Sequence, residues 1–277
     1  MVVVAALVAY WAYSSQIAPW GETVIRVNDT VFDMDYFVKR MRTYPRDTSE
    51  YTVARKIKDG ELAKQGAAQL GISVLPGNIT DAIESYLIEN YGTETNPDPT
   101  PEQIDEWYAH FRGFTGFTEE EVRGLFEIIL LEEQVWYHFR DNDVPETGKH
   151  VHLLRLIRST EEEALDALEK LNAGNETVMA EFLSGDAGWV PRGILPDLDD
   201  VIFDLEPGNL SGPMSTEQGF ELVRVVEVEE DRELSENHRT ILTNDIYEQW
   251  LEDLWLSGTV EDYLDADKIA WARDHLD

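Results

Sequence analysis

The chain has 277 residues and a formal charge of −34, because 56 acidic side chains outnumber 22 basic ones. Such a charge repels the phosphates of nucleic acids and of anionic membrane surfaces, so neither is an expected partner. The absence of cysteine excludes disulfides, thiolate nucleophiles, Cys-ligated zinc and iron–sulfur clusters. With 43% apolar residues the chain is still able to bury a core, and its length suits one to three domains.

The first thirteen residues, Met1 to Tyr13, carry no charge. This run is shorter than the roughly 20 apolar residues that a spanning helix needs. Extended through Ile17, with Trp20 at the interface, it predicts a membrane anchor over residues 1–20 whose basic cytoplasmic start precedes the sequence. The remaining chain would then lie outside the cytoplasm. The alternative is a buried strand or helix at the start of a soluble protein.

Residues 21–148 are predicted to be mostly helical. Alternating polarity around Asn28-Asp29 indicates a pair of short strands over residues 23–32, and Asp33 is a typical N-cap for the helix that follows. A second helix is expected over residues 50–70, with Gly71 as its stop. Its inward positions are Ala54, Ile57, Leu62 and Ala68; further helices are expected over residues 76–90, after the Thr100-Pro101 cap, and after the capping box Thr118 to Glu121, which opens the longest helix.

The pattern changes over residues 149–230. A strand is expected over residues 151–157, and a capping box at Thr160 and Glu163 starts a helix that runs through Leu171. A tight turn (185–189), a short helix (198–205) and a last strand (219–228) complete a small α+β domain. Residues 231–277 are predicted to be helical again, with an apolar stripe made by Ile241, Ile246, Trp250, Leu251 and Leu254.

Five motifs in the middle segment carry a resemblance to a known family. They are LIRSTEEEA (156–164), GDAGW (185–189), LDDVIF (198–203), PGNLS (207–211) and GPMSTEQG (212–219). In this order and spacing they resemble a parvulin-type peptidyl-prolyl isomerase domain. Residues 21–148 resemble the helical N-terminal module of the SurA and PrsA foldases through Val27-Asn28-Asp29, and residues 231–277 resemble the C-terminal segment that packs on that module.

The resemblance implies an α+β fold in which a helical chaperone module, built by both ends of the chain, holds an inserted small antiparallel sheet domain over residues 149–230. Rotation about an X–Pro bond has a barrier of about 18–20 kcal/mol, caused by amide resonance, and needs no covalent step or cofactor. An enzyme has to hold the proline ring in an apolar pocket and favour the twisted amide through desolvation and a few hydrogen bonds.

The resemblance also places the site residues. Ile194, Leu198 and Phe203 match the apolar proline-binding wall, and Ala187 stands where the family usually has a larger leucine. Leu198 and Phe203 are equally expected in a plain core. The polar set consists of Thr216, Gln218 and two positions that usually carry histidine, which here are Arg155 and Glu221.

Arg155 and Glu221 are expected to form an ion pair across neighbouring strands in place of a histidine network. His152 would point to the opposite face from Arg155 unless the strand bulges there, because side chains alternate along a strand. No metal site is predicted: His150 and His152 lie on one strand face and could chelate a metal, but two histidines at the edge of the linker are the favoured interpretation.

Three functions remain open. The first is a membrane-anchored extracytoplasmic foldase that binds unfolded or proline-containing exported polypeptides and isomerises X–Pro bonds. The second is a non-catalytic holdase, and the third is a membrane-tethered scaffold for one dedicated partner; a homodimer is left open. The segment from Phe111 to Phe117 is expected either to pack in the core or to expose its rings to client chains on a glycine-containing loop. The acidic surface suits a soluble holdase or a saline environment.

Overall fold

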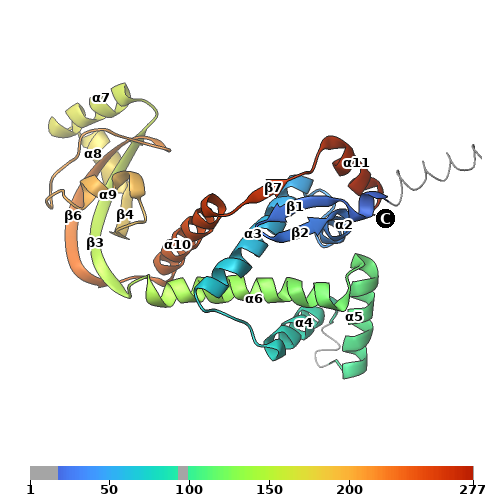
Figure 1. Ribbon diagram of the computed structural model, residues 1–277. Coiled ribbons are helices and arrows are strands. Elements are labelled where there is room, and N and C mark those ends of the chain that lie inside the picture. Colours follow the sequence, from blue (N-terminus) through green and yellow to red (C-terminus); the bar gives the residue numbers. More distant parts are fainter. Residues whose placement is uncertain (1–17, 93–98, 277) are drawn as a thin grey trace, which may run out of the picture. The chain divides into compact units, whose positions relative to one another are not determined.

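The computed structural model describes residues 18–92 and 99–276 (Figure 1). Within these residues the chain forms two compact units. The helical unit holds the described residues up to Tyr137 together with those from Tyr247 onward, and the sheet unit holds His138 to Ile246. Helices and antiparallel sheets occur together, so the predicted α+β class is confirmed.

The apolar run on which the anchor prediction rests, residues 1–17, lies outside the described residues. A search of the described helices for a span that is long and apolar enough to cross a bilayer finds none.

The helical unit contains the two ends of the described chain. It begins with a short 3-10 helix, Ala18–Gly21, and its further elements are β1 (Thr23–Val27), β2 (Thr30–Asp33), α2 (Met34–Met41), α3 (Glu50–Gln69), α4 (Pro76–Tyr91), α5 (Pro101–Thr115), β7 (Val260–Asp262) and α11 (Ala266–Asp274). Helices α6 (Glu119–Asn142) and α10 (Glu236–Ser257) begin or end inside the sheet unit, so both contribute residues to both units.

Strand β1 joins the two ends of the chain. It is the central strand of a three-stranded sheet in the order β2-β1-β7, and both pairings are antiparallel. The predicted hairpin at Asn28-Asp29 is confirmed, and Asn28 has a positive φ of 53°. Strand β7 was not predicted. It is fixed further by an ion pair of 2.6 Å between Lys58 Nζ and Asp262 Oδ2.

The predicted helix signals in this unit are confirmed by their hydrogen bonds. Asp33 accepts from the N–H of Tyr36, and the Thr118 hydroxyl and Glu121 carboxylate exchange two bonds with each other's backbone N–H groups. Helix α6 is the longest of the described helices, with 24 residues. One prediction is wrong: Ala68 is exposed and Ala67 is buried in its place, because α3 turns its inward face slightly toward the earlier position.

Helix α3 lies very close to α10. A Cβ placed on Gly66 would lie 2.5 Å from Cζ2 of Trp250 and 2.6 Å from Cδ1 of Leu254, which is well inside van der Waals contact. The lack of a side chain at Gly66 therefore allows the C-terminal part of α10 to pack against α3 in the helical unit.

The sheet unit is built on two long strands. Its elements are β3 (Thr147–Arg158), α7 (Glu161–Asn172), α8 (Glu176–Ser184), β4 (Asp186–Pro191), α9 (Pro196–Ile202), β5 (Met214–Thr216) and β6 (Gly219–Glu233). All neighbours in the order β4-β3-β6-β5 are antiparallel. The segment 185–189, predicted as a tight turn, instead opens strand β4, and α8 and β5 were not predicted.

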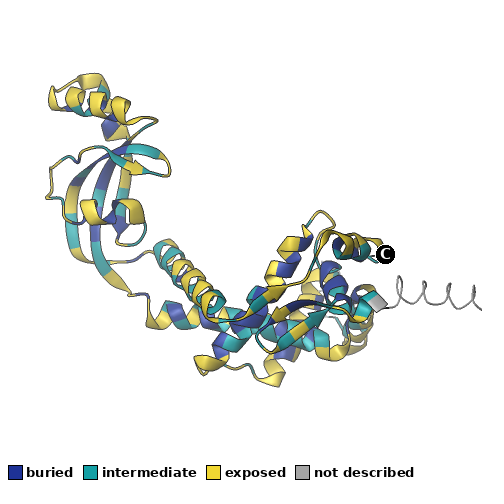
Figure 2. Ribbon diagram, turned by 45° about the horizontal axis from the view of Figure 1, so that its top comes forward, coloured by how far each residue is buried: buried dark blue, intermediate teal, exposed yellow. Residues whose placement is uncertain are grey.

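Each face of this four-stranded sheet covers its own core. One face packs against α9 through Leu153, Val223 and Val225, and the other packs against α7 and α8 through Leu154, Leu156 and Leu222. Figure 2 shows the buried positions running along the long strands β3 and β6. The α9 face carries the candidate site.

Replacing Gly66 by alanine is expected to destabilise the helical unit. The added methyl group has to displace Trp250 and Leu254, and such overpacking costs about 1–3 kcal/mol of unfolding free energy. Gly124 of α6 is the matched control because a Cβ added there would have no atom within 4 Å, and Gly124→Ala is expected to raise stability by about 0.5–1 kcal/mol. Chemical denaturation followed by circular dichroism measures both. Equal effects of the two substitutions would contradict the close α3–α10 contact.

Candidate peptide-binding site

A buried ion pair lies on the α9 face of the sheet. Arg155 of β3 donates from Nε to Oε2 of Glu221 and from Nη2 to Oε1, both at 2.8 Å. Glu221 of β6 is 1% exposed, whereas the side chain of Arg155 keeps 19% of its surface exposed. Arg155 is directly opposite Val223, so Glu221 is its diagonal neighbour on the same face. The two positions where histidines were expected thus hold one closed charge pair.

Thr216 extends this polar group onto the edge strand. Its hydroxyl lies 2.9 Å from Oε1 of Glu221 and 3.1 Å from the carbonyl oxygen of Gly219, and it accepts from the N–H of Gln218 at 3.2 Å. Glu221 therefore receives hydrogen bonds from two strands, which offsets the cost of burying its charge. The side chain of Gln218 is exposed beyond this group.

The predicted apolar wall is only partly accessible. Leu198 and Phe203 are 1% and 5% exposed and belong to the core that packs on this face. Ile194, which precedes α9, is half-buried and packs against the same core. Ala187 is exposed on β4. It lies at the register shift of the β3–β4 pairing, between Asp186 and Gly188, and has no partner residue on β3. The structure therefore brings Ile194, Leu198 and Phe203 together and leaves Ala187 outside their cluster.

Met214 is a further candidate site residue, which the sequence analysis missed. It is directly opposite Glu221 in the β5–β6 pairing, it is half-buried, and it packs against the core that contains Leu198. It lies two residues before Thr216 on β5 and thus shares its face, a relation that becomes a signal only once β5 is known to be a strand. Met214 connects the ion pair to the apolar wall.

Asp199 supports the turn that carries Ile194. Its Oδ2 accepts from the N–H of Gly193 at 2.7 Å, while its Oδ1 is buried without a hydrogen-bond partner among the described residues. Burial raises the pKa of this carboxyl, and the Gly193 N–H and Arg192 oppose that effect. Arg192 also lies over the ring of Phe203, at 4.5 Å from its centroid. The loop before α9 is thus held on the α9 face by polar contacts.

The two strand histidines do not join the ion pair. The β3–β6 register shifts between His152 and Leu153, but His152 Nε2 bonds Oδ1 of Asp186 at 2.8 Å and its ring stacks on Trp189. The pKa of Asp186 is lowered by the Gly188 N–H and by His152. His150 is buried, with Nδ1 2.8 Å from the carbonyl oxygen of Gly148. The rings thus have different partners, and no group of three or more metal-binding side chains occurs in the part of the chain that is described.

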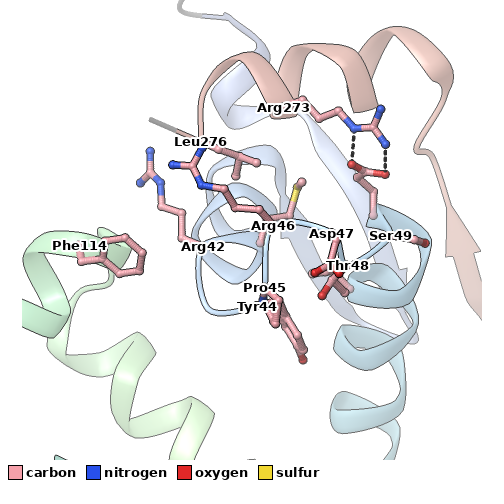
Figure 3. A pocket seen from close by; sticks show the side chains of 13 residues that line it. Arg42, Tyr44, Pro45, Arg46, Asp47, Thr48, Ser49, Phe114, Arg273 and Leu276 are labelled. Atoms are coloured by element: carbon pink, nitrogen blue, oxygen red, sulfur yellow. Dashed lines mark hydrogen bonds and ion pairs between the residues drawn. The ribbon is translucent and has the colours of Figure 1, made fainter. Parts of the chain in front are cut away.

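Of the two alternatives for the aromatic segment, core packing is confirmed for Phe111 and Phe117. Residues 111–115 belong to α5, which ends at Gly116 with a left-handed φ of 82°, and Phe111 and Phe117 are buried in the core. Only Phe114 is exposed among the three rings, at 62%. It lines a cavity of about 390 Å³ that also includes Arg42, Arg273 and Leu276 (Figure 3).

Comparison with known families identifies the class of the sheet unit. Residues 134–236 match the family model described as the PPIC-type PPIASE domain. The sheet unit therefore carries a parvulin-type domain, as its motifs predicted. The matched range includes the ion pair, Thr216 and the apolar wall.

The chain is also similar to whole proteins that contain such a domain. It is 24% identical over 140 residues to the chaperone SurA of Methylococcus capsulatus, and this match covers 49% of the chain and 31% of the relative. The matched region thus spans about a third of the relative's length. The parvulin-type domain and this similarity both agree with the resemblance to the SurA and PrsA foldases.

Similar solved structures include two PrsA isomerases. PrsA from Bacillus anthracis has a TM-score of 0.43 at 13% identity, over 80% of this chain and 94% of that one. PrsA from Bacillus cereus has a TM-score of 0.35 at 15% identity, over 83% and 94%.

Replacing Arg155 by methionine is expected to destabilise the sheet unit strongly. The substitution leaves the buried Glu221 carboxylate without its cation, and breaking a buried pair in this way costs about 3–5 kcal/mol. Arg158→Met is the control, because Arg158 pairs with the half-exposed Glu181 and such a surface pair contributes less than about 1 kcal/mol. Urea denaturation, combined with hydrogen exchange of β6, measures the difference. If Arg155→Met lowered the free energy of unfolding no more than Arg158→Met does, a stabilising role of the pair would be contradicted.

Proposed function

We propose that this chain is an extracytoplasmic foldase that binds unfolded, proline-containing exported polypeptides and isomerises their X–Pro bonds. The single observation that carries the proposal is the position of the polar group. Arg155, Glu221 and Thr216 lie on the same sheet face as the apolar cluster of Ile194 and Leu198, with Met214 between them. A proline ring and its preceding carbonyl group need such an apolar surface beside hydrogen-bond donors.

The available donors come from Arg155. Its Nε and Nη2 are engaged by Glu221, but a guanidinium has five N–H donors, and those of Nη1 form no hydrogen bond within the described residues. In the proposed mechanism Ile194 and Met214 hold the proline ring. Nη1 then donates to the carbonyl oxygen of the preceding residue or to the pyramidal nitrogen of the twisted amide. Glu221 and Thr216 are positioning residues that keep the guanidinium in place.

A second candidate function is non-catalytic binding of extended peptides by the same domain. The closed Arg155–Glu221 pair favours it, because both carboxylate oxygens are already bonded within the site and neither position holds a histidine that could exchange a proton with a substrate. The burial of Leu198 and Phe203 also leaves a shallower apolar wall than an open pocket would have. A scaffold for one dedicated partner remains the third candidate.

The proposal includes location and domain roles. The uncharged run of residues 1–17 supports a membrane tether over residues 1–20, with the rest of the chain outside the cytoplasm. In this proposal residues 21–148 and 231–277 form the chaperone module, and residues 149–230 form the isomerase domain. The similarity to the chaperone SurA of Methylococcus capsulatus supports the chaperone role.

A protease-coupled assay with a short X–Pro peptide tests the isomerase activity. The wild-type chain is expected to accelerate the slow phase above the uncatalysed rate. Ile194→Ala is expected to lower kcat/KM about tenfold, because removing an apolar contact with the proline ring costs about 1–3 kcal/mol. Leu165→Ala is the control: this leucine is half-exposed on α7, which covers the opposite face of the sheet, and its loss is expected to leave the rate unchanged.

A wild-type rate equal to background at high protein concentration would remove the isomerase claim and leave the binding function. The double substitution Arg155→His and Glu221→His then shows whether the missing histidines are the reason. An activity gained by the double variant would support the site assignment even though the natural chain is inactive.

Suppression of client aggregation tests the chaperone part separately. The chain is expected to keep an unfolded, reduced client soluble at near-equimolar ratios, because its acidic surface prevents association of the complexes. Light scattering during dilution of the client from denaturant measures this effect, with bovine serum albumin as the protein control. No reduction relative to that control would favour the dedicated scaffold.

A further inference from the structure

The helical unit contains a second cavity, of about 270 Å³, whose wall combines apolar side chains with a buried cation. Its apolar wall comes from α4, α5 and α6 and consists of Tyr86, Phe111, Leu125, Phe126, Ile128 and Ile129. Arg40 of α2 and Lys56 of α3 line the other side. An apolar cavity of this size accommodates one large side chain, and Ile129 at its edge is 48% exposed.

Arg40 is the unusual member of this wall. It is 8% exposed, and its guanidinium lies over the ring of Tyr44 and donates from Nη2 to the Tyr44 hydroxyl at 3.1 Å. Its Nε is buried without a hydrogen-bond partner, and no carboxylate forms an ion pair with it in the part of the chain that is described. Buried charges in proteins are normally paired, and this guanidinium has no carboxylate bonded to it.

No carboxylate in the cavity wall bonds Arg40 among the described residues. Glu132 lines the same wall, but it forms no ion pair or hydrogen bond within the described residues, and burial raises the pKa of its carboxyl, with Lys56 and Arg40 opposing this effect and Asp59 adding to it. Glu132 thus feels the charge of Arg40 without bonding it. Lys56 is exposed at the rim and adds a second positive charge.

We propose that this cavity binds the C-terminal residue of a client polypeptide, with its α-carboxylate on Arg40 and its apolar side chain against Phe111 and Phe126. The last residue of a chain carries a carboxylate and a side chain on one Cα, and the cavity has the size and the chemistry for both. An internal acidic residue brings the charge but no apolar group, and its flanking peptide bonds would need further polar partners. The inference rests on the proposed chaperone function and adds which part of a client is recognised.

The cavity beside Phe114 provides the contrast. Its Arg42 donates to the carbonyl oxygens of Thr115 and His275, and its Arg273 forms the bidentate ion pair with Glu50 that Figure 3 shows. These two guanidinium groups already have partners and hold the C-terminal helix in place. The unsatisfied Nε of Arg40 thus distinguishes its cavity from the larger one.

Fluorescence anisotropy with a labelled peptide tests the proposal on the full chain. The probe is a flexible peptide without acidic side chains that ends in phenylalanine, made once with a free carboxylate and once as the C-terminal amide. The free acid is expected to bind about tenfold to a hundredfold more tightly than the amide, as a hydrogen-bonded charge pair with a guanidinium provides. Arg40→Gln is expected to remove this difference, and Arg40→Lys to restore part of it.

Controls separate the alternatives. Arg46→Gln, in the wall of the cavity beside Phe114, is expected to leave the difference unchanged. Circular dichroism and aggregation suppression by the Arg40→Gln variant show whether it folds and remains a chaperone. Equal binding of acid and amide by a wild-type chain that suppresses aggregation would overturn the proposal while the proposed function stands. The proposal would also be overturned if Arg46→Gln removed the difference between acid and amide as Arg40→Gln does. The same holds if an amidated peptide with an internal glutamate bound as tightly as the free acid.

Discussion

The pairing of β1 with β7 is the constraint on which the arrangement of the chain depends. It joins residues more than 200 positions apart, so the chain that leaves the helical unit along α6 has to return to it along α10. Asn28 strengthens the junction: its backbone N–H donates to the carbonyl of Thr259, its Oδ1 accepts from the Thr259 N–H, and its Nδ2 donates to Gln65. The sheet unit is therefore an insertion into a module closed by both chain ends.

The same requirement explains the small residues of α3. Trp250 and Leu254 of α10 pack against Gly66, and Ile128 of α6 packs against Gly60. Both helices that connect to the sheet unit therefore approach α3 closely. The returning helix is fixed by packing, and the following strand β7 is fixed by hydrogen bonds. Because loop closure costs little more for a long insertion than for a short one, a domain of this size is accommodated at a modest cost in entropy.

The sequence predicted those elements whose signals are local. Asp33 and Thr118 cap helices through hydrogen bonds to residues three positions further on, and Gly71 ends a helix through its positive φ. These signals are local, so they mark helix ends independently of the tertiary structure. Strands β5 and β7 have three residues each, too few for a periodic pattern. Strand β7 pairs with the distant strand β1, and β5 is recognisable only as the short arm of a hairpin with β6. For Phe111 and Phe117 the sequence left core packing and an exposed loop open, because Gly113 and Gly116 lie between the two rings; α5 continues past Gly113, and both rings are buried in the core.

The site shows a similar limit. Strand alternation and the family motifs were enough to predict that Arg155 and Glu221 meet, since both positions lie on long strands of one sheet. They did not reveal Met214, whose place depends on the edge pairing of β5. Burial decides the rest: Leu198 matches a binding-site position by sequence, yet its side chain lies almost wholly in the core, and sequence alone does not distinguish a core leucine from a pocket leucine.

The basic side chains of this chain lie among a large excess of acidic ones. With more than two acids for every base, a basic side chain readily finds a carboxylate, and Lys58, Arg155 and Arg273 each have one. A guanidinium that is buried without a bonded carboxylate is therefore unexpected in this chain, because its burial costs free energy that a nearby carboxylate would offset. In the helical unit this applies to Arg40, whose aromatic and aliphatic surroundings would otherwise favour an apolar residue. Retention of a cation there is what a site for an incoming anion requires.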